Sequence, residues 1–378
     1  MKEELVQKLD EMRNQVGPAD EGAIAKAAAR LDDIAKPLDG LGVFEEWIKK
    51  AAGATRSADI VVDPAQLLVF CADNGVVEEG VTQSESYITG NIARNIATGK
   101  SAVGCLAADA GCTVRVIDLG MTDDARDAVF DILLRGDEEA EIGVVDRNVK
   151  KGTENFLKAP AMSEEELISA IECGFTEAVK AIDKGAKIIL VGEAGIGNTT
   201  TSATIASALL GITPEETVGR GSGLSDKGLS KKIEVVRYGL VKNGFEVDVK
   251  AEGDEEVLRL LTNLGGLDIA GIIGAILGAA SKNVPIVTDG VISSAAALAA
   301  YRLCPDVAAY ILPGHCGKEP AVSMIHEEMG MSAPIHADLS LGEGTGAVMA
   351  YMLFKMVLTA YRDAATFEDI HMDGYERL

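Results

Sequence analysis

The sequence has little of what a metal centre requires. Its six cysteines include no Cys-x-x-Cys pair, and it contains only four histidines. We therefore expect no metal site. Cysteines scattered in this way usually pack as small hydrophobic residues in a reducing compartment, so the sequence predicts a cytoplasmic protein.

Positive charge is also scarce. The 378 residues include 35 lysines and arginines against 59 aspartates and glutamates, which gives a formal net charge of −24. Nucleic acids and anionic membranes both bind basic surfaces, so we expect neither as a partner. A small phosphate is still compatible with this balance, because backbone amides and one or two lysines can bind it.

Long apolar runs are missing. The most apolar stretches, residues 269–281 and 344–354, end at Lys282 and Lys355, whereas a membrane-spanning helix needs ~20 apolar residues. Residues 1–10 are charged and have a helical pattern, unlike a signal peptide. We expect a soluble protein.

Two nucleotide-binding fingerprints are absent as well. The glycines after the central strand do not follow the Gly-x-Gly-x-x-Gly order, and Asp289 lies far beyond the ~20 residues expected for a ribose-binding acid. Residues 98–101 resemble the end of a Walker loop, but Arg94 stands where its first glycine is required. These absences argue against a Rossmann oxidoreductase and exclude a P-loop nucleotide hydrolase.

Predicted strands and helices alternate along the chain. Short apolar runs predict strands, and between them amphipathic or small-residue segments predict helices. The strands are expected at residues 66–71, 114–119, 188–191, 285–288, 308–312 and 335–341. Helices are expected at residues 88–98, 164–182, 227–243, 264–280 and 293–302, with a last helix up to Tyr361.

This alternation predicts an α/β fold with a parallel sheet, whose loops gather at one edge. We expect a large α/β domain over residues 61–344, which carries the site. Residues 1–60 and 345–378 are expected to form a smaller helical subdomain. The charged stretch 122–165, which includes residues 138–141, is interpreted as solvated surface.

The chain is organised around a glycine-rich turn between residues 188–191 and a small-residue helix that ends at Gly211. Asn198 or Thr199 is the expected N-cap of this helix. Free amides and the helix dipole make such a turn an anion site, although similar turns also occur without ligands. Glu193 lies inside it and would repel a phosphate, so it is expected to face a hydroxyl, a cation or a proton in transit. The turn glycines are Gly192, Gly195 and Gly197.

A second glycine loop covers residues 219–223, and Ser225 or Asp226 is expected to cap the helix that follows. Lys231 and Lys232 near the start of this helix are either solvated or, for one of them, bound to a phosphate. Lys36, in the Pro- and Gly-containing connector at residues 36–42, is a weaker phosphate candidate.

Three further side chains follow predicted strands. Asp73 fits either a ligand site or an Asx turn, and His315 fits either a core or a site position. Glu343 is different, because a carboxylate between Gly342 and Gly344 is costly to bury without a purpose.

Five segments together resemble the nicotinate-nucleotide–dimethylbenzimidazole phosphoribosyltransferase family, over about residues 36–361. They are residues 192–200, 219–224 with Lys231 and Lys232, 264–270, 289–293 and 341–346. The resemblance implies a Rossmann-like parallel sheet with a small helical domain, a homodimer and no cofactor. It also implies the reaction of nicotinate mononucleotide with 5,6-dimethylbenzimidazole, which gives α-ribazole 5′-phosphate and nicotinate.

The resemblance also assigns residues. Glu343 is the expected general base and Glu193 the second catalytic carboxylate. The expected nucleotide-binding residues are Gly192, Gly195, Gly197, Asn198, Thr199, Gly221, Ser222, Gly223, Lys232, Asp289, Gly290, Ser293, Gly314, His315, Gly342 and Gly344. The expected base-binding residues are Asp73, Thr82, Gly90 and Leu341.

The chain departs from the family pattern mainly around the base. Residues 72–75 read Ala-Asp-Asn-Gly where the family usually has Ala-Asp-His-Gly, residues 37–42 and 80–89 also differ, and Ala321-Val322 replaces Gly-His. The base is therefore open, and some relatives act on phenols as paired, non-identical subunits. The alternative is a non-catalytic or regulatory nucleotide-binding subunit of such a pair.

Overall fold

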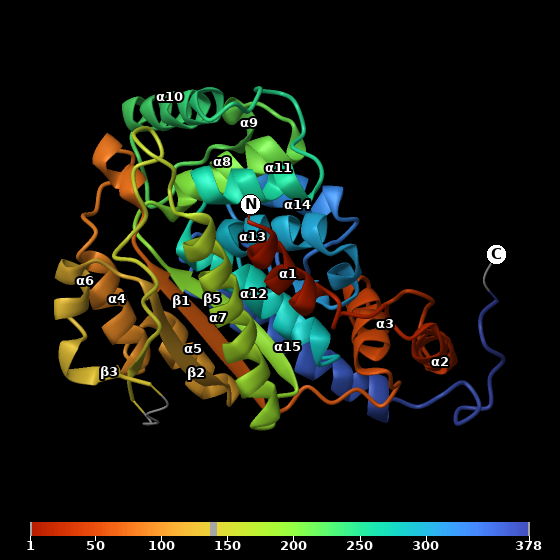
Figure 1. Ribbon diagram of the computed structural model, residues 1–378. Coiled ribbons are helices and arrows are strands. Elements are labelled where there is room, and N and C mark those ends of the chain that lie inside the picture. Colours follow the sequence, from red (N-terminus) through yellow and green to blue (C-terminus); the bar gives the residue numbers. More distant parts are fainter. Residues whose placement is uncertain (1, 137–141, 377–378) are drawn as a thin grey trace.

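A seven-stranded parallel sheet forms the centre of the computed structural model, which describes residues 2–136 and 142–376 (Figure 1). The strands lie in the order β3-β4-β2-β1-β5-β6-β7, and each neighbouring pair is parallel. Their bounds are β1 Ala65–Ala72, β2 Thr113–Gly120, β3 Leu133–Leu134, β4 Val144–Asp146, β5 Ile188–Ala194, β6 Ile286–Thr288 and β7 Ile311–Pro313. The predicted parallel α/β fold is confirmed.

Alternate strand residues face two separate cores. On β1, Leu67 and Val69 belong to one core, whereas Leu68 and Phe70 belong to the other. Both faces of the sheet are covered, which explains why its strands read as continuous apolar runs rather than as an alternating pattern.

The core that contains Leu68 and Phe70 lies under helices that come from the whole length of the chain. In Figure 1, α1, α7 and α12 lie in front of the sheet, and α8 to α11 gather at the upper end. These helices are α1 Glu3–Arg13, α7 Glu164–Asp183, α8 Asn198–Leu210, α9 Pro214–Thr217, α10 Asp226–Lys242, α11 Asp254–Leu264, α12 Leu267–Ser281, α13 Val291–Leu303 and α14 Ala321–Glu328. The other core lies under α2 Glu21–Asp33, α3 Val43–Thr55, α4 Ile88–Ala97, α5 Ala102–Ala110, α6 Asp123–Asp127 and α15 Thr345–Asp363.

The glycines of α12 allow it to lie directly against α7. A Cβ at Gly274 would collide with the Ile171 carbonyl, and one at Gly174 with the Gly271 carbonyl. These glycines therefore bring the backbones of the two helices together. Its expected start is wrong, because Gly265 and Gly266 separate α11 from α12, where one helix over residues 264–280 was predicted.

Three other local predictions are wrong. Residues 335–341 form no strand and contribute only an isolated bridge from Ile335 to His315. The strand predicted from residue 308 begins at Ile311, after the 3₁₀ helix Pro305–Ala309. Gly197, in the left-handed region with φ +94°, is the N-cap of α8 in place of Asn198 or Thr199.

The stretch 122–165 is more structured than its charge indicated. It contains α6, β3 and β4, and Val144 and Val145 are buried in the cores. The short pairing of β4 with β2 is enough to bury these two side chains. Residues 138–141, which were interpreted as solvated, lie outside the described residues.

The terminal segments pack in two places. Helix α1 lies against α7 and α12, whereas α3 contacts both α2 and α15. A bridge between Ile34 and Thr366 joins the N-terminal helices to the chain after α15. The division into two domains stays a prediction. In the described part of the chain, every helix is too short or too polar to cross a membrane.

Candidate active site

A cavity of about 210 Å³ opens at the carboxyl edge of the sheet. Its wall is formed by the turns after β5, β6 and β7, by the first residues of α8 and α13, and by residues 339–343 before α15. Ligands of open α/β sheets bind at this edge, because helix N-termini and strand-end side chains converge there. The site was predicted at this edge from the sequence.

Most of the predicted site residues meet in this cavity. Those that line it are Thr82, Glu193, Gly195, Gly197, Asn198, Thr199, Gly221, Ser222, Asp289, Gly290, Ser293, His315, Leu341, Gly342 and Glu343. They come from stretches that lie far apart in the sequence, and the fold alone brings them together. The roles assigned to them stay predictions.

Seven of the predicted site residues do not line the cavity. Gly192 and Gly344 lie behind it, where a Cβ at Gly192 would collide with the Glu343 carbonyl. Gly314 packs on the Thr288 carbonyl, and the carbonyl of Gly223 accepts a 2.6 Å hydrogen bond from Gln83 Nε2. The other three are Asp73, Gly90 and Lys232.

Asp73 and Gly90 support the wall rather than forming it. Asp73 accepts hydrogen bonds from Thr89 Oγ1 at 2.6 Å and from the amide and hydroxyl of Thr122 at 2.8 and 2.9 Å. A Cβ at Gly90 would collide with the Ala125 carbonyl, because α4 packs closely on α6. The bonds to Asp73 come from distant segments and not from an Asx turn, since the Gly75 amide donates to Thr153 Oγ1 at 3.0 Å. The base-binding roles of both residues stay predictions.

Lys232 lies behind the second glycine loop. Its side chain is fully buried, and Nζ donates to Thr199 Oγ1 at 2.9 Å and to the Gly219 carbonyl at 3.2 Å. Burial lowers the pKa of this ammonium to about 8, although the nearby Glu319 acts in the opposite direction. The ammonium thus fixes both glycine turns from behind, and its phosphate role stays a prediction. Lys36 forms an ion pair with Glu45 at 2.7 Å, outside the cavity.

Glu343 lies in a strained turn. It has φ +64°, between Gly342 at +79° and Gly344 at +91°, and left-handed backbone is costly for a residue with a Cβ. One of its carboxylate oxygens, Oε2, is buried without a hydrogen-bond partner in the described structure. Burial, and next the charge of Asp289, raise the pKa of this carboxyl. These features suit a base that binds a proton during a reaction.

Asp289 holds that turn in place. Its two oxygens accept hydrogen bonds from the amides of Gly344, Gly346 and Ala347, at 3.1, 2.7 and 3.2 Å. A carboxylate from the end of β6 therefore caps the N-terminus of α15, where it is also stabilised by the helix dipole. Asp289 lines the cavity, but both of its oxygens are engaged by the backbone amides around the Glu343 turn.

Glu193 and Asp268 share one amide group. Asn198 Nδ2 donates to a carboxylate oxygen of Glu193 and, at 2.9 Å, to Asp268 Oδ2. Burial, together with the charge of Asp268, raises the pKa of Glu193 to about 8, and burial raises the pKa of Asp268 to about 6. Glu193 therefore carries a proton at neutral pH. A Cβ at Gly342 would lie 2.9 Å from Glu193 Oε1, so the two carboxylate turns touch.

His315 lies between the β6 and β7 turns. Its Nδ1 is 3.5 Å from Asp289 Oδ1, outside good hydrogen-bond distance, and is buried without a hydrogen-bond partner in the part of the chain described. A Cβ at Gly290 would lie 3.3 Å from the imidazole. The ring thus forms part of the cavity wall beside the first turn of α13, with an unused nitrogen.

The sequence did not point to several residues of the wall. Most are apolar and come from helix starts or loops, which resemble ordinary core positions in a sequence. They are Ile92, Ile196, Val291, Ile292, Val322 and Leu339, together with the polar Lys318, Glu319 and Ser340. Some carried a signal: Val322 lies where the chain departs from the family pattern, and Ile196, Val291 and Ile292 lie in the resembling segments 192–200 and 289–293. Within residues 2–136 and 142–376, no three His, Cys, Asp or Glu side chains are placed to hold a metal ion.

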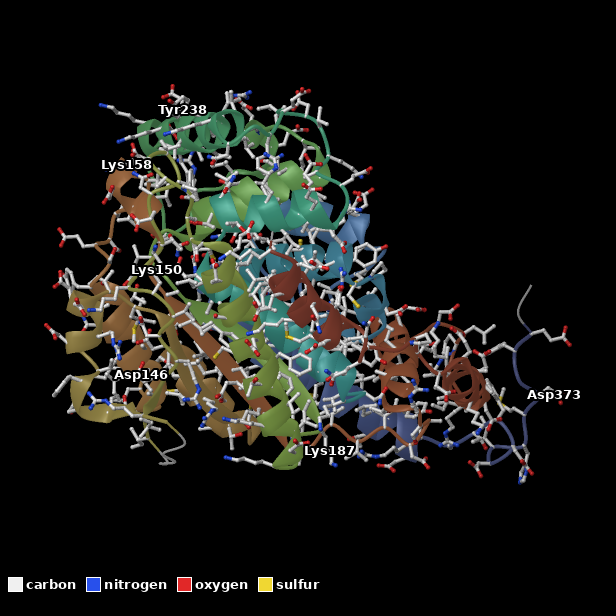
Figure 2. All side chains as sticks on the ribbon, viewed as in Figure 1. Asp146, Lys150, Lys158, Lys187, Tyr238 and Asp373 are labelled. Carbon is white, nitrogen blue, oxygen red and sulfur yellow. The ribbon has the colours of Figure 1, made fainter. Side chains whose placement is uncertain are left out.

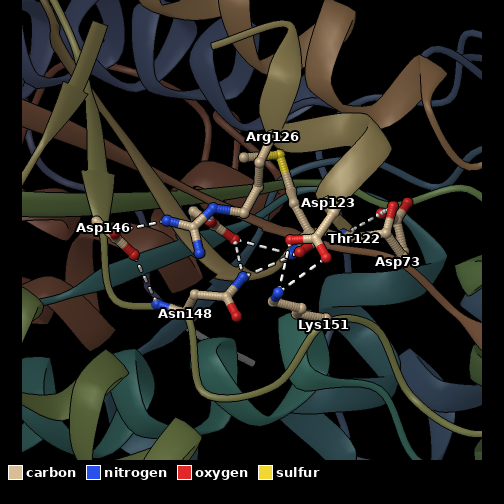
Figure 3. Close-up of polar contacts among 9 residues, drawn as sticks. Asp73, Thr122, Asp123, Arg126, Asp146, Asn148 and Lys151 are labelled. Carbon is tan, nitrogen blue, oxygen red and sulfur yellow. Dashed lines mark hydrogen bonds and ion pairs between the residues drawn. The ribbon is translucent and has the colours of Figure 1, made fainter. Parts of the chain in front are cut away.

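A second cluster of acids lies at the same edge, at the ends of β1 and β2. Figure 3 shows part of its polar contacts. Asp118 accepts from the Met121 amide at 2.8 Å and from Asn148 Nδ2 at 2.9 Å, and it pairs with Arg126 Nε at 3.2 Å. Arg126 also pairs with Asp146 at 2.6 Å. This cluster fixes the loops after β2 and β4 beside Asp73 and Thr122.

The chain was compared with known proteins and structures. A family model described as phosphoribosyltransferase matches residues 16–371. The chain is 38% identical to nicotinate-nucleotide–dimethylbenzimidazole phosphoribosyltransferase of Acetivibrio thermocellus, over 92% of this chain and 93% of the relative. For the Ruminiclostridium cellulolyticum protein of the same name the identity is 37%, over 98% and 99%. The crystal structure of CobT from Thermus thermophilus is similar, with a TM-score of 0.81 and 31% identity over 93% of this chain and 99% of that one.

Proposed function

The chain belongs to the nicotinate-nucleotide–dimethylbenzimidazole phosphoribosyltransferase family, and from this premise we propose that it transfers the phosphoribosyl group of nicotinate mononucleotide to a lower-ligand base. The base is 5,6-dimethylbenzimidazole or a related ring, and the products are an α-ribazole phosphate and nicotinate. The reaction belongs to cobamide biosynthesis. The relatives described above carry the name of the enzyme, so the alternative of a regulatory subunit gains no support.

The chemistry needs one base and no acid. Nicotinate leaves C1′ of the ribose as a neutral pyridine, because its ring nitrogen begins as a pyridinium. The incoming benzimidazole nitrogen forms the new bond to C1′ and must lose its proton. Attack from the opposite face converts the β configuration to α. Positive charge that develops on C1′ is stabilised by a nearby carboxylate.

Glu343 is the observation that carries this proposal. Its buried, unpartnered oxygen and raised pKa suit a group that accepts the proton of the attacking nitrogen. Glu193 is the weaker candidate, since its pKa of about 8 leaves it protonated at neutral pH. A protonated Glu193 can donate a hydrogen bond to a ribose hydroxyl, which fits the expectation that it faces a hydroxyl.

Apolar side chains of the cavity supply contacts for two aromatic rings. Ile92, Ile292, Val322 and Leu339 line the wall that also carries the carboxylates. Small-molecule sites usually combine such apolar walls with a few polar groups that fix orientation. Thr82 lies within the departing segment 80–89 and Ile92 lies shortly after it, so we propose that they contact the incoming base.

Mass spectrometry of reaction products tests the proposed function. The purified chain is incubated with nicotinate mononucleotide and a panel of benzimidazoles, phenols and adenine. We expect nicotinate release together with one dominant nucleotide product that contains a benzimidazole. The proposal fails if no base in the panel causes nicotinate release.

Two further points belong to the proposal. The six cysteines are all free, as is usual in a reducing compartment, which supports a cytoplasmic location.

We also propose a homodimer, on the basis of the family resemblance. Light scattering measures the mass of the purified protein in solution and so tests this proposal. A mass of one chain at micromolar concentration would contradict it, and a requirement for a second, different chain would favour a paired enzyme.

A further inference from the structure

The cavity wall has one fixed positive charge. Among the described residues that line the cavity, Lys318 is the only lysine or arginine. The same wall carries the carboxylates of Glu193, Asp289, Glu319 and Glu343. An anionic substrate that enters this cavity therefore meets mostly like charge, and a single cation has a large influence on whether it binds.

The Lys318 ammonium is available for a ligand. Its backbone amide donates to the Leu339 carbonyl at 3.2 Å, which anchors the loop, while the side chain is exposed. No hydrogen bond or ion pair to its Nζ is found within the described ranges 2–136 and 142–376. The cations near the cavity differ in this respect, since Lys232 is bound to Thr199 and Gly219, and Arg220 pairs with Asp226.

The position of Lys318 indicates which part of the substrate it meets. Residues 315–319 cross the cavity from the start of α13 to the second glycine loop. His315 lies beside Gly290 at one end. At the other end Glu319 Oε1 accepts a 2.8 Å hydrogen bond from the Gly221 amide. Lys318 is adjacent to Glu319 and so belongs to the glycine-loop end, where Gly221 and Ser222 also line the cavity.

We propose that the Lys318 ammonium binds the 5′-phosphate of the nucleotide substrate and makes the enzyme select phosphorylated over unphosphorylated ribosides. The inference rests on the proposed function for the identity of the substrate. A phosphate monoester carries about two negative charges at pH 7 and needs a cation in such an acidic cavity. The amide of Gly221 is already occupied by Glu319, so the glycine loop offers this phosphate less than its sequence indicates.

The test compares two variants on two substrates. Lys318→Met keeps the length and apolar stem of the side chain without its charge, and Lys318→Arg restores a cation. Each is assayed with nicotinate mononucleotide and with nicotinate riboside, which lacks the phosphate. The matched control is Lys187→Met, because Lys187 is also exposed and lies at the opposite, lower edge of the molecule in Figure 2.

We expect Lys318→Met to raise the KM for nicotinate mononucleotide about 10-fold with kcat nearly unchanged, as for the loss of one charged hydrogen bond. Lys318→Arg should recover most of this loss, and Lys187→Met should behave as the unmodified chain. The KM for the riboside should be the same in all variants. An equal loss on both substrates, or no loss on the nucleotide, would overturn the proposal.

Calorimetry separates this inference from the proposed function. Binding of nicotinate mononucleotide is titrated in the absence of any base, so no turnover is needed. If the unmodified chain binds the nucleotide but never releases nicotinate, the proposed function fails while the roughly 10-fold weaker binding by Lys318→Met still supports the phosphate site. Equal binding by both proteins refutes the site even where catalysis is intact.

Discussion

Two clusters of buried acids lie at the same edge of one sheet and differ in how they are paired. At the ends of β1 and β2, Asp73 is bonded by Thr89 and Thr122, and Asp118 by Asn148 and Arg126. Figure 3 shows Asp73, Thr122, Arg126 and Asn148 in this cluster. Around the cavity, one oxygen of Glu343, one of Glu319 and Nδ1 of His315 are buried without a hydrogen-bond partner in the described structure. Asp118 Oδ2 also accepts no hydrogen bond there, but it lies 3.2 Å from the Arg126 guanidinium, whereas the carboxylates of Glu343 and Glu319 form no ion pair among the described residues.

The free-energy cost of burying a carboxylate is therefore offset to different extents in the two clusters. Burial raises the pKa of Asp118 to about 6, but the Met121 amide, Asn148 and Arg126 act in the opposite direction. For Glu343 both burial and the neighbouring charge of Asp289 raise the pKa. Bonded acids hold loops together, whereas buried acids with unused oxygens remain reactive.

The largest effect that tests this comparison is expected at Glu343. Glu343→Gln keeps the size and polarity of the side chain but cannot accept a proton. We expect kcat to fall 10²- to 10⁴-fold, about 3–5 kcal/mol of barrier, with nucleotide binding by calorimetry nearly unchanged. The fall in rate at acidic pH, where Glu343 becomes protonated, should also disappear. If the variant keeps both its kcat and the fall in rate at acidic pH, another group accepts the proton. Glu193 would then be the next candidate to test.

A change in the second cluster, around Asp118 and Arg126, should lower the stability of the protein and leave its activity nearly unchanged. Arg126→Met leaves Asp118, which is fully buried, without its cation, although the Arg126 side chain itself is 21% exposed. We expect the free energy of unfolding to fall by about 2–3 kcal/mol, measured by urea denaturation. Per active molecule, kcat should change little.

The control for this variant is Arg94→Met, which breaks the exposed ion pair with Asp131. Surface pairs contribute only ~0–1 kcal/mol, so this variant should lose much less stability than Arg126→Met. A large loss of kcat in Arg126→Met at unchanged stability would show that the two clusters are not functionally distinct.

The apolar part of the cavity is expected to give the next effect. Ile92→Ala removes ring contacts on the proposed base side, so kcat/KM for dimethylbenzimidazole should fall about 10-fold. The KM for nicotinate mononucleotide should stay unchanged. Ile142→Ala, at an exposed isoleucine outside the cavity, is the matched control. If every base loses rate equally together with the nucleotide, Ile92 supports the wall without selecting the base.

The last effect is a change in the pH dependence of stability and not a loss at one pH. The pKa of Glu193 is about 8 in the folded chain, against an ordinary value of 4.5. Between these pH values the folded state holds a proton that the unfolded state has released. The free energy of unfolding therefore falls as pH rises, by at most about 1.4 kcal/mol per pH unit from this group. In Glu193→Gln this slope should be smaller between pH 5 and 8. An unchanged slope would show that Glu193 is ionised in the folded protein.

The comparison also separates what the sequence predicts from what it does not. Parallel strands and their glycine turns follow from local patterns, and so did the position of Glu193 and Glu343 at one edge. The sequence could not predict the environment of Asp73, because its partners Thr89 and Thr122 come from distant segments. Lys318 and Ile92 carry no local signal, since only tertiary packing directs a loop lysine or a helical isoleucine toward a cavity. The wrong strand at residues 335–341 has a similar cause, because its alternating apolar residues do not pair with the sheet beyond one bridge to His315, and Leu341 is 53% exposed.

The left-handed backbone of Glu343 also bears on how this protein would evolve. A glycine at position 343 would adopt φ +64° without penalty, whereas other residues lose ~1–2 kcal/mol there. Selection for heat resistance alone would therefore favour Glu343→Gly, a substitution that abolishes the proposed chemistry. The glutamate can persist only where its turnover is under selection. Thermostability screens of this chain should accordingly include an activity assay, because the substitution that most readily raises stability at this turn yields a more stable but inactive protein.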